Sequence, residues 1–399
     1  MAEVLVIGSG FAGLSAAARL AKLRHRVTVL EASAEPGGLL LGREFAGQRW
    51  TTGPQSVTLP GVFRDLFRKS GRPMDALISI STAPPRRHLL PGRFGRSPIE
   101  FDLPFGTRGA QHDAVVGAFG KDHWSDWVDG LADEWNTLRR AVLEPVQSEL
   151  SPATKAALGG TRTVKEQTKR LGRRLAPVAA DLPGVGPQDQ SVATVIHYVE
   201  RNFGRWEFAG GLPGLAAALL NRLTERRVQI ETGVHVAEVL VRQGRAHGVR
   251  TTDGTTRAAD IVIWATGDRT ETAELAAIES PDLSLTTDLV AHLKPAVHLW
   301  RSGPSRWLLS SPLGTDPVAL ATRAGLELST ATINRLPHST QPRNPQLRTG
   351  APADRWSSMA IETTPGLWLI GGAAVTGAGL EWTGMGTAAL AGAIGSAPR

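Results

Sequence analysis

Three glycines near the start of the chain are spaced to approach a phosphate group. Gly8, Gly10 and Gly13 form the pattern Gly-x-Gly-x-x-Gly. In such a turn the first glycine permits a tight bend, the second lets the backbone approach a pyrophosphate, and the third lets a helix pack closely on a sheet. A helix that begins at this turn presents free N–H groups and the positive end of its dipole. The spacing therefore predicts a pyrophosphate site.

A single carboxylate, Glu31, completes this pattern 23 residues after Gly8. At the end of a second strand, its side chain can accept hydrogen bonds from both hydroxyl groups of a ribose. The same charge repels a 2′-phosphate, which disfavours an NADP-type ligand. We interpret the four residues as an adenine-dinucleotide site. The alternative is a close-packed strand–helix–strand unit that holds no ligand.

The elements that must position these residues are visible in the pattern around them. An apolar strand is expected over Val4–Ile7, a helix of small residues from Phe11 to Leu23, and a second strand over Val27–Leu30. This order gives a strand, a glycine turn, a helix and a strand that ends in the carboxylate. It predicts an α/β fold with a Rossmann-like dinucleotide domain around a central parallel sheet.

Two further motifs carry a resemblance to a known family. The pair Gly37-Gly38 follows Glu31 closely, and in this context the chain resembles the glutathione-reductase-type FAD fold. The run from Trp50 to Pro60, followed by an amphipathic segment, resembles the phytoene desaturase branch of the phytoene desaturase and amine oxidase-like superfamily. Thr51 stands where that branch has aspartate. The resemblance implies non-covalently bound FAD.

The resemblance also marks residues late in the chain. Most of the superfamily has Gly-Asp where this chain has Gly371-Gly372, and the aspartate there contacts the ribityl chain. A helix expected to begin near Gly384, after the insertion of residues 381–383, would aim its N-terminus at the flavin. The cofactor-binding residues so predicted are Gly8, Gly10, Phe11, Ala12, Gly13, Glu31, Ala32, Gly37, Gly38, Leu39, Gly53, Pro54, Val236, Ala265, Thr266, Gly267, Gly371, Gly372, Gly384 and Met385.

Catalytic side chains are fewer. Lys294 lies about where amine oxidases, by resemblance, place a lysine that holds a water near the flavin; the alternative is a surface lysine. Trp382 falls in the expected closing loop and could face the flavin. His292 and His298 alternate in the same stretch, and no cluster of carboxylates accompanies them, so we interpret them as core or surface histidines. No metal site is predicted.

The order of the motifs predicts two interleaved domains. Residues 1–72, 206–270 and 355–399 are expected to form a discontinuous FAD-binding domain. Residues 73–205 and 271–354 are expected to form an α+β substrate domain. A tryptophan-bearing helix from Trp124 to Val142 belongs to the second domain, where its stripe is either core or the wall of a substrate channel.

Composition narrows the function classes. The chain of 399 residues has no cysteine, which excludes thiol catalysis and a redox-active cysteine pair. Its net charge of +7 comes mainly from scattered arginines, and no nucleic-acid motif accompanies them. No signal peptide or membrane span is recognised, so we expect a cytoplasmic protein. A basic amphipathic helix over residues 161–175 could rest on a membrane surface; the alternative is a solvated basic face.

Three functions remain open at this point. The first is an FAD-dependent dehydrogenase, oxidase or desaturase that moves a hydride from a lipophilic, isoprenoid or secondary-metabolite substrate to flavin. The second is a flavin amine or amino-acid oxidase. The third is a non-catalytic carrier like the Rab GDP-dissociation inhibitors, which resemble this fold. No second dinucleotide unit is found, so oxygen or a quinone is the expected electron acceptor.

Overall fold

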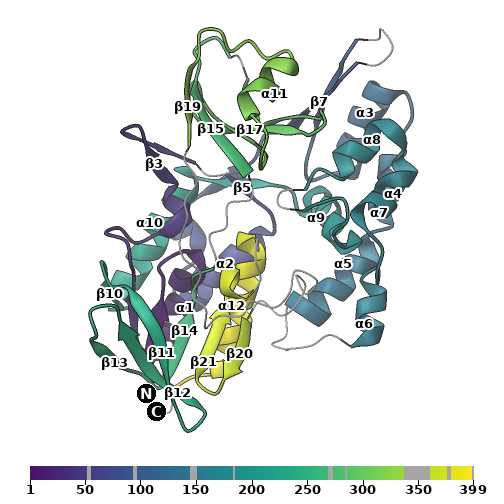
Figure 1. Ribbon diagram of the computed structural model, residues 1–399. Helices are drawn as coiled ribbons and strands as arrows, with labels where there is room; N and C mark the ends of the chain where they lie inside the picture. The colour runs from purple at the N-terminus through teal and green to yellow at the C-terminus, as the bar shows by residue number, and fades with distance from the viewer. Residues whose placement is uncertain are drawn as a thin grey trace.

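The structure is a computed structural model that describes most of the chain (Figure 1). It describes residues 1–51, 55–92, 97–143, 151–182, 185–267, 273–283, 285–336, 360–374 and 379–397. Gly53 and Pro54, two of the predicted cofactor-binding residues, lie outside the described residues.

The central layer is a six-stranded sheet with the strand order β10-β2-β1-β14-β21-β20. The first five strands in this order run parallel, and β20 is antiparallel at the edge. The strands are β10 (Gln229–Glu231), β2 (Arg26–Leu30), β1 (Glu3–Ile7), β14 (Ile261–Trp264), β21 (Leu367–Ile370) and β20 (Ala360–Thr364). The apolar runs of β1, β14 and β21 are typical of strands that are covered on both faces. The predicted α/β class with a central parallel sheet is confirmed.

Alternate residues of β1 point to two different layers. Val4 and Val6 face a helical layer, and Leu5 and Ile7 face a small antiparallel sheet. The helices of the first layer are α1 (Phe11–Lys22), α2 (Pro60–Ser70), α10 (Gly211–Glu225) and α12 (Leu380–Ile394). The strands of the second layer are β11 (Val236–Arg242), β12 (Arg245–Thr251) and β13 (Thr256–Ala258). The parallel sheet is therefore the middle of three layers.

A seven-stranded sheet lies at the other end of the molecule, at the top of Figure 1. Its order is β19-β15-β18-β17-β16-β7-β8, and only the pairing of β16 with β7 is parallel. Helix α11 (Pro317–Arg323) packs on one face of this sheet. The strands are β7 (Arg86–Leu90), β8 (Ile99–Leu103), β15 (Ala273–Glu279), β16 (Leu289–Ala291), β17 (Val297–Gly303), β18 (Arg306–Pro312) and β19 (Thr332–Arg335).

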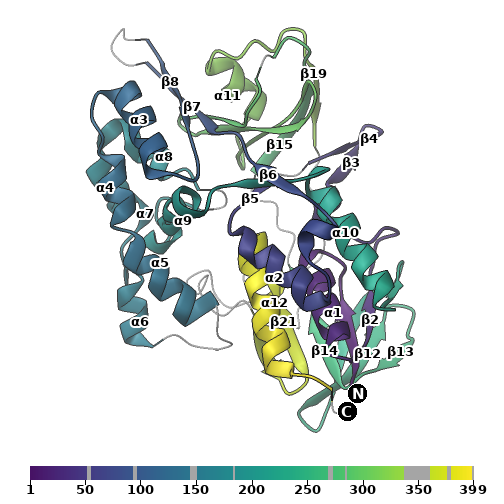
Figure 2. The same cartoon turned by 180° about the vertical axis from the view of Figure 1, so that it is seen from behind.

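Short strands connect the two sheets. A hairpin is formed by β3 (Arg43–Phe45) and β4 (Gln48–Trp50), and a three-stranded sheet has the order β5-β9-β6. Its strands are β5 (Ser56–Val57), β9 (Trp206–Phe208) and β6 (Ile80–Thr82). The 3₁₀ turn η1 (Gly38–Leu41) precedes β3, and the 3₁₀ turn η2 (Met74–Ala76) lies between α2 and β6. Figure 2 shows β6 crossing between the upper sheet and the layer of α2 and α10.

A lobe of helices forms the remaining part, on the right of Figure 1. Trp124, Trp127 and Trp135 are at most 4% exposed within it, so these tryptophans of the predicted stripe are core residues in the structure. The elements of the lobe are α3 (Arg108–Phe119), α4 (Trp124–Asp129), α5 (Ala132–Leu138), the π-helix η3 (Arg139–Leu143), α6 (Pro152–Ala157), α7 (Val164–Thr168), η4 (Lys169–Leu171), α8 (Gly172–Ala179), η5 (Ser191–Val195) and α9 (Ile196–Phe203).

Three predicted helices have different bounds. The helix expected over 124–142 is divided at Gly130, between α4 and α5. The helix expected over 161–175 is divided into α7, η4 and α8, and Gly172 has a φ of +70° where the chain turns. The helix expected to begin near Gly384 begins at Leu380 instead, so Glu381 and Trp382 form its first turn rather than a loop.

The basic segment of 161–175 turns its apolar residues inward. Val164, Leu171 and Leu175 are at most 5% exposed and belong to the core of the helical lobe. Lys165, Lys169, Arg170, Arg173 and Arg174 are exposed. Because the apolar face of this segment is already covered, only its charged side chains are available to a membrane surface. Contact of this segment with a membrane stays a prediction. In the part of the chain that the structure describes, no helix is long and apolar enough to span a bilayer.

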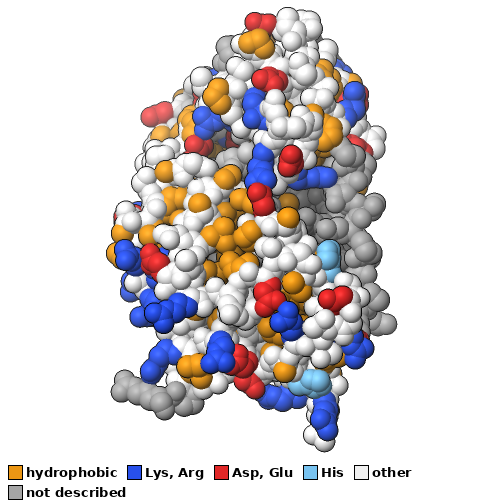
Figure 3. Space-filling model, turned by 90° about the vertical axis from the view of Figure 1, so that its left-hand side faces the viewer, with side chains coloured by type: hydrophobic (Ala, Val, Ile, Leu, Met, Phe, Trp, Pro, Cys, Tyr) orange, Lys and Arg blue, Asp and Glu red, His pale blue; other side chains and the backbone are white. Residues whose placement is uncertain are grey.

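Charges of both signs share the face seen in Figure 3, which is the left-hand side of Figure 1. Lys and Arg side chains lie among Asp and Glu side chains around a central group of apolar side chains. This mixture agrees with the scattered positions of the basic residues in the sequence.

Candidate functional site

The glycine turn after β1 has the backbone geometry that its sequence predicts. Gly8 has a φ of +94°, a conformation that favours glycine, and its N–H donates to the carbonyl of Leu30 at 2.8 Å. A Cβ on Gly13 would lie 1.9 Å from the carbonyl oxygen of Gly8. Any larger residue at position 13 would therefore push α1 away from the turn. The first and third glycines fix the helix against the strand.

The N-terminus of α1 is open. Gly10 is its N-cap; no side chain caps it, and its first turn carries no acidic residue. A Cβ on Gly10 would meet no protein atom within 4 Å. The first N–H groups of a helix lack partners within the helix itself, and they favour an anion. Open space directly in front of an uncapped helix fits the phosphates of a dinucleotide.

Glu31 lies beside this turn and is only 7% exposed. Its Oε2 accepts hydrogen bonds from the N–H and the hydroxyl of Ser9, at 2.8 and 2.5 Å, and its Oε1 accepts from the N–H of Ser33 at 2.8 Å. Burial alone would raise the pKa of Glu31, but the hydrogen bonds from Ser9 and Ser33 outweigh it and hold the pKa below its ordinary value. Since a carboxylate has about four acceptor sites, capacity remains for a ribose hydroxyl.

The second glycine pair closes on the first turn. The N–H of Gly37 donates to the hydroxyl of Ser9 at 3.1 Å. Gly38 has a φ of +57°, and a Cβ there would lie 3.0 Å from the Cα of Gly10. Gly37 and Gly38 thus join the dinucleotide turn through Ser9 and Gly10. Two other predicted contacts near them, Ala32 and Leu39, are exposed, and Leu39 is 54% exposed.

A second wall of small residues comes from the ends of β14 and β21. The N–H of Ala265 donates to the carbonyl of Ile7 at 2.9 Å. Thr266 lies against Gly8, because a Cβ on Gly8 would meet the methyl group of Thr266. A Cβ on Gly267 would lie 2.7 Å from backbone atoms of Gly372. Because parallel strands place their carboxyl ends at one edge of the sheet, these turns gather beside the glycine turn after β1.

The 3₁₀ turn η7 (Gly371–Ala373) packs directly on α1. Gly371 has a φ of +59°, and a Cβ there would lie 2.8 Å from the Cβ of Ala12. The position where most of the superfamily has aspartate, Gly372, instead makes a close backbone contact with Gly267. Val236, at the start of β11, is half-buried in the core on the other face of the sheet.

The first turns of α12 connect this edge to the helical lobe. A Cβ on Gly384 would lie 2.6 Å from Val62, and the ring of Phe11 is 3.7 Å away. Oε1 of Glu381 accepts hydrogen bonds from the N–H and the hydroxyl of Thr58. Trp382 and Met385 are half-buried in an apolar cluster that includes Trp135, whose ring centroid is 6.1 Å from that of Trp382.

Lys294 does not join these residues. Its side chain is exposed in the turn between β16 and β17, and its carbonyl accepts a hydrogen bond from Arg323 of α11 at 3.2 Å. The lysine therefore lies with the helix that covers the seven-stranded sheet. Its predicted role beside a flavin gains no support from this position.

Sequence reasoning did not identify three polar contacts between distant segments. Arg205 donates to the hydroxyl and the carbonyl of Ser56, at 2.8 and 2.7 Å, and so joins β9 to β5. Thr58 binds Glu381, and Asp181 binds His298 at 2.9 Å. In the sequence, these contacts are marked only by a polar residue within an apolar stretch. Such a residue does not indicate which partner, more than 100 positions away, it will contact.

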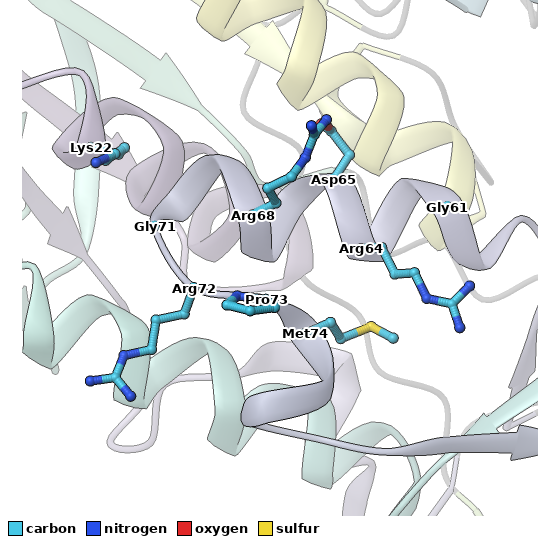
Figure 4. A pocket seen from close by; sticks show the side chains of 9 residues that line it. All are labelled: Lys22, Gly61, Arg64, Asp65, Arg68, Gly71, Arg72, Pro73 and Met74. Atoms are coloured by element: carbon cyan, nitrogen blue, oxygen red, sulfur yellow. The ribbon is translucent and has the colours of Figure 1, made fainter.

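A surface depression of about 690 Å³ lies away from this edge. The depression includes Lys22 at the C-terminal end of α1, whereas the glycine turn lies at the N-terminal end. A helix of this length spans about 18 Å, so the two sites are at opposite ends of α1. Arg68 points to Asp65, at 2.9 Å, and Arg72 pairs with Glu225. Figure 4 shows the ends of Arg64 and Arg72 directed away from each other. These cations do not converge on a common ligand.

The sequence model of the family described as flavin containing amine oxidoreductase matches residues 11–270. Hydroxyneurosporene desaturase from Cereibacter sphaeroides is 26% identical over 279 residues, which are 66% of this chain and 55% of that protein. The zeta-carotene-forming phytoene desaturase from Myxococcus xanthus is 27% identical over 276 residues, 65% of this chain and 52% of that protein. The chain thus spans about half the length of these curated relatives.

A solved structure shares the fold over nearly the whole chain. It is an oxidoreductase from Methanosarcina mazei, with a TM-score of 0.61 and 16% sequence identity. The superposition covers 97% of this chain and 99% of that one.

Proposed function

Because the chain belongs to the family of flavin-containing amine oxidoreductases, we propose that it is an FAD-dependent oxidoreductase that acts on a lipophilic, isoprenoid-like substrate. The proposal rests above all on one observation. The uncapped N-terminus of α1, with open space at Gly10, lies beside the buried carboxylate of Glu31. This pair of features suits a pyrophosphate next to an adenosine ribose.

The residues that would hold the cofactor have different roles. Gly8, Gly10 and Gly13 let the backbone of α1 approach the pyrophosphate, and Glu31 accepts hydrogen bonds from the ribose. Gly267, Gly371 and Gly372 keep the edge of the sheet free of side chains. We propose non-covalent binding; the chain has no cysteine, so a cysteinyl thioether to flavin is excluded. Flavin, when bound, supplies the redox chemistry by taking a hydride from the substrate.

An apolar surface beside α12 supports a lipophilic substrate. Trp382 and Met385 of α12 pack against Trp135 of the helical lobe, and Phe203, 41% exposed, has its ring centroid 5.9 Å from that of Trp135. Apolar side chains exclude water from a reacting bond and can bind a long hydrocarbon. The names of the two relatives point the same way, because both are desaturases of carotenoid-type molecules.

Two alternatives have less support. An amine oxidase of this fold is expected to use a lysine near the flavin, and Lys294 is exposed beside α11. A carrier without flavin would not need to keep the glycine turn and a buried, hydrogen-bonded Glu31. For the electron acceptor we propose oxygen or a quinone, because the sequence offers one dinucleotide unit only.

The first experiment is the absorption spectrum of the purified protein. Oxidised-flavin bands, with FAD released intact by acid, would support the cofactor and its non-covalent attachment. The protein would then be mixed anaerobically with phytoene, hydroxyneurosporene and a series of aliphatic amines, and bleaching of the flavin bands would be followed. Bleaching by the polyenes is the expected result. A protein that stays colourless in excess FAD would overturn the proposal, and bleaching by amines alone would favour the amine oxidase.

A further inference from the structure

Helix α2 has one side in the core and one side that carries cations. Phe63 and Phe67 are fully buried, whereas Arg64 and Arg68 are exposed. Residues four positions apart share a face of a helix, so each pair lies on its own side of α2. The cationic side borders the surface depression of about 690 Å³, which the exposed Lys22 of α1 also lines (Figure 4).

This depression has more positive charge than its carboxylate can balance. The charged residues that line it are Lys22, Arg64, Arg68, Arg72 and Asp65. The single carboxylate, Asp65, is shared, because one of its oxygens lies 2.9 Å from Arg68 and the other lies 2.9 Å from the buried Arg19. Within the part of the chain that the structure describes, Lys22 and Arg64 form no ion pair. Their charges are therefore left uncompensated by the protein.

A second carboxylate nearby is shared in the same way. Glu225 of α10 pairs with both Arg72 and Arg222, and Arg226 donates to the carbonyl of Ser70 at 2.7 Å. Burial, and then the charges of Arg226 and Arg72, lower the pKa of Arg222 from its ordinary value. Together with the cations above, this makes seven cationic side chains against two carboxylates. The region holds an excess of five positive charges in a chain whose net charge is +7.

Helix ends explain only part of this charge. A cation near the C-terminus of a helix is stabilised by the helix dipole. Arg222 and Arg226 both donate to the carbonyl of Ser70, the last residue of α2, and Lys22 is the last residue of α1. Arg64 instead lies in the second turn of α2, where the dipole gives a cation no advantage. The outer side of α2 is thus more basic than the stability of the helices requires.

We propose that Lys22, Arg64, Arg68 and Arg72 form a basic face that docks on a bilayer containing anionic lipids. The choice of a bilayer over other polyanions rests on the proposed function, because a lipophilic, isoprenoid-like substrate dissolves in a bilayer and not in water. The ends of Arg64 and Arg72 point away from each other (Figure 4), which suits many separate headgroups better than one bound anion. Lys and Arg side chains are attracted to an anionic membrane surface without insertion of a helix.

Helix α2 connects the basic face to the apolar surface beside α12. Val62, in its first turn, contacts Gly384 of α12 and belongs to the apolar cluster of Trp135 and Trp382. The helix has 11 residues and so spans about 16 Å. A bilayer held against the basic face therefore lies within about one helix length of the surface that we propose for the substrate. Docking should raise the rate at which a membrane-dissolved substrate reaches the protein.

The first test measures binding without substrate. The purified protein would be floated with vesicles of phosphatidylcholine and phosphatidylglycerol, and with vesicles of phosphatidylcholine alone. We expect binding to the anionic vesicles only, and its loss at high salt, because ions screen the attraction. In the triple variant Lys22→Gln, Arg64→Gln, Arg68→Gln the affinity should fall about fivefold per cation, and so about 100-fold in all. Asp65 keeps its contact with Arg19 in this variant, so the fold should be retained.

A matched triple variant tests whether the position of the charges matters. Lys165→Gln, Arg173→Gln, Arg174→Gln removes three exposed cations from the helical lobe, and it should bind the anionic vesicles as the wild type does. Four results would overturn the proposal: equal binding to vesicles without phosphatidylglycerol, wild-type affinity in the variant of the basic face, an equal loss in both triple variants, or binding to a DNA duplex in place of vesicles.

The second test measures delivery of the substrate. Phytoene would be supplied in the anionic vesicles or in micelles of an uncharged detergent, and bleaching of the flavin bands would be followed. The variant of the basic face should be slower by about 10-fold or more with vesicles, and equal to the wild type with micelles. A wild-type rate with vesicles would contradict docking through this face. A protein that floats with anionic vesicles but holds no flavin would support the basic face and refute the proposed function, whereas a flavoprotein that does not float would refute the basic face alone.

Discussion

Ser9 donates two hydrogen bonds to Glu31, one from its backbone N–H and one from its hydroxyl, at 2.8 and 2.5 Å. The same hydroxyl accepts a hydrogen bond from the N–H of Gly37 at 3.1 Å. One serine thus joins the glycine turn, the carboxylate and the second glycine pair. The carboxylate is preorganised as an anion before any ribose reaches it.

Reversing the charge of Glu31 should abolish flavin retention. Glu31→Arg removes a charge-assisted hydrogen bond to a ribose hydroxyl, about 1.5–3 kcal/mol or roughly 10- to 100-fold in affinity, and it disrupts the contacts of Ser9 with the turn. The measurement is the flavin-to-protein absorbance ratio after gel filtration, followed by fluorescence titration with FAD. Glu35→Arg makes the same change at a side chain that is 62% exposed and pairs with Arg49, and it should retain flavin. Equal flavin content in both variants would contradict the assigned cofactor site.

Alanine at two neighbouring glycines should separate folding from binding. In Gly13→Ala the new Cβ would lie 1.9 Å from the carbonyl of Gly8, and we expect a loss of about 1–3 kcal/mol in the free energy of unfolding. In Gly10→Ala the new Cβ meets no protein atom, so stability should be kept while affinity for FAD falls. Urea denaturation and FAD titration measure the two effects. Unchanged affinity in Gly10→Ala would show that this open space is not the pyrophosphate site.

Stability should fall as the pH drops from about 6.5 to about 4. Burial, with further effects of His298 and Arg86, lowers the pKa of His292 to about 4 although Asp181 opposes this. Between the two values the unfolded chain binds a proton that the folded chain refuses, so acid favours unfolding by on the order of 3 kcal/mol. Chemical denaturation at several pH values measures the slope. His292→Gln should flatten it, and a change at the exposed His247 should not. An identical slope in His292→Gln would argue that another group is responsible.

We expect Glu200 to stabilise the contact between α9 of the helical lobe and β7 of the seven-stranded sheet. It is 5% exposed, accepts a hydrogen bond from Arg205 at 2.6 Å and lies 3.6 Å from Arg86. Glu200→Gln leaves two buried guanidinium groups without an anion, and a loss of about 3–5 kcal/mol is expected in denaturant unfolding. Glu207→Gln breaks a more exposed pair with Arg301 and should cost less than about 1 kcal/mol. Similar losses in the two variants would mean that Glu200 does not hold a buried charge network.

The sequence predicted the features that depend on residues close together in the chain. The spacing of Gly8, Gly10, Gly13 and Glu31 reflects a single strand–helix–strand unit, and the structure places all four at one edge of the parallel sheet. The start of α12 was wrong by four residues, because Glu381 and Trp382 do not break a helix that Thr58 anchors from outside. The breaks at Gly130 and at Gly172, whose φ is +70°, interrupt segments whose apolar spacing is helical on both sides.

Contacts between distant segments were beyond the sequence. His298 had no carboxylate among its neighbours in the chain, and Asp181 reaches it from a different lobe, 117 positions earlier. The partners of Arg205 and Glu381 come from the short segment after β4. Such pairs depend on how the layers of the fold pack against one another. The spacing of apolar residues in the sequence does not reveal this packing. The bounds of the two predicted domains stay a prediction for the same reason.

The strand order of the parallel sheet has a consequence for the timing of biosynthesis. On one side β14 pairs with β1, and on the other it pairs with β21, which leaves the ribosome about 100 residues later. Until then the edge of β14 is unpaired, and α1 lacks the cover that α12 provides. Pairing across such a long interval is slow, because a large loop must close first. We therefore expect the sheet to be complete only after β21 has left the ribosome, and a nascent chain arrested before residue 360 should not retain FAD.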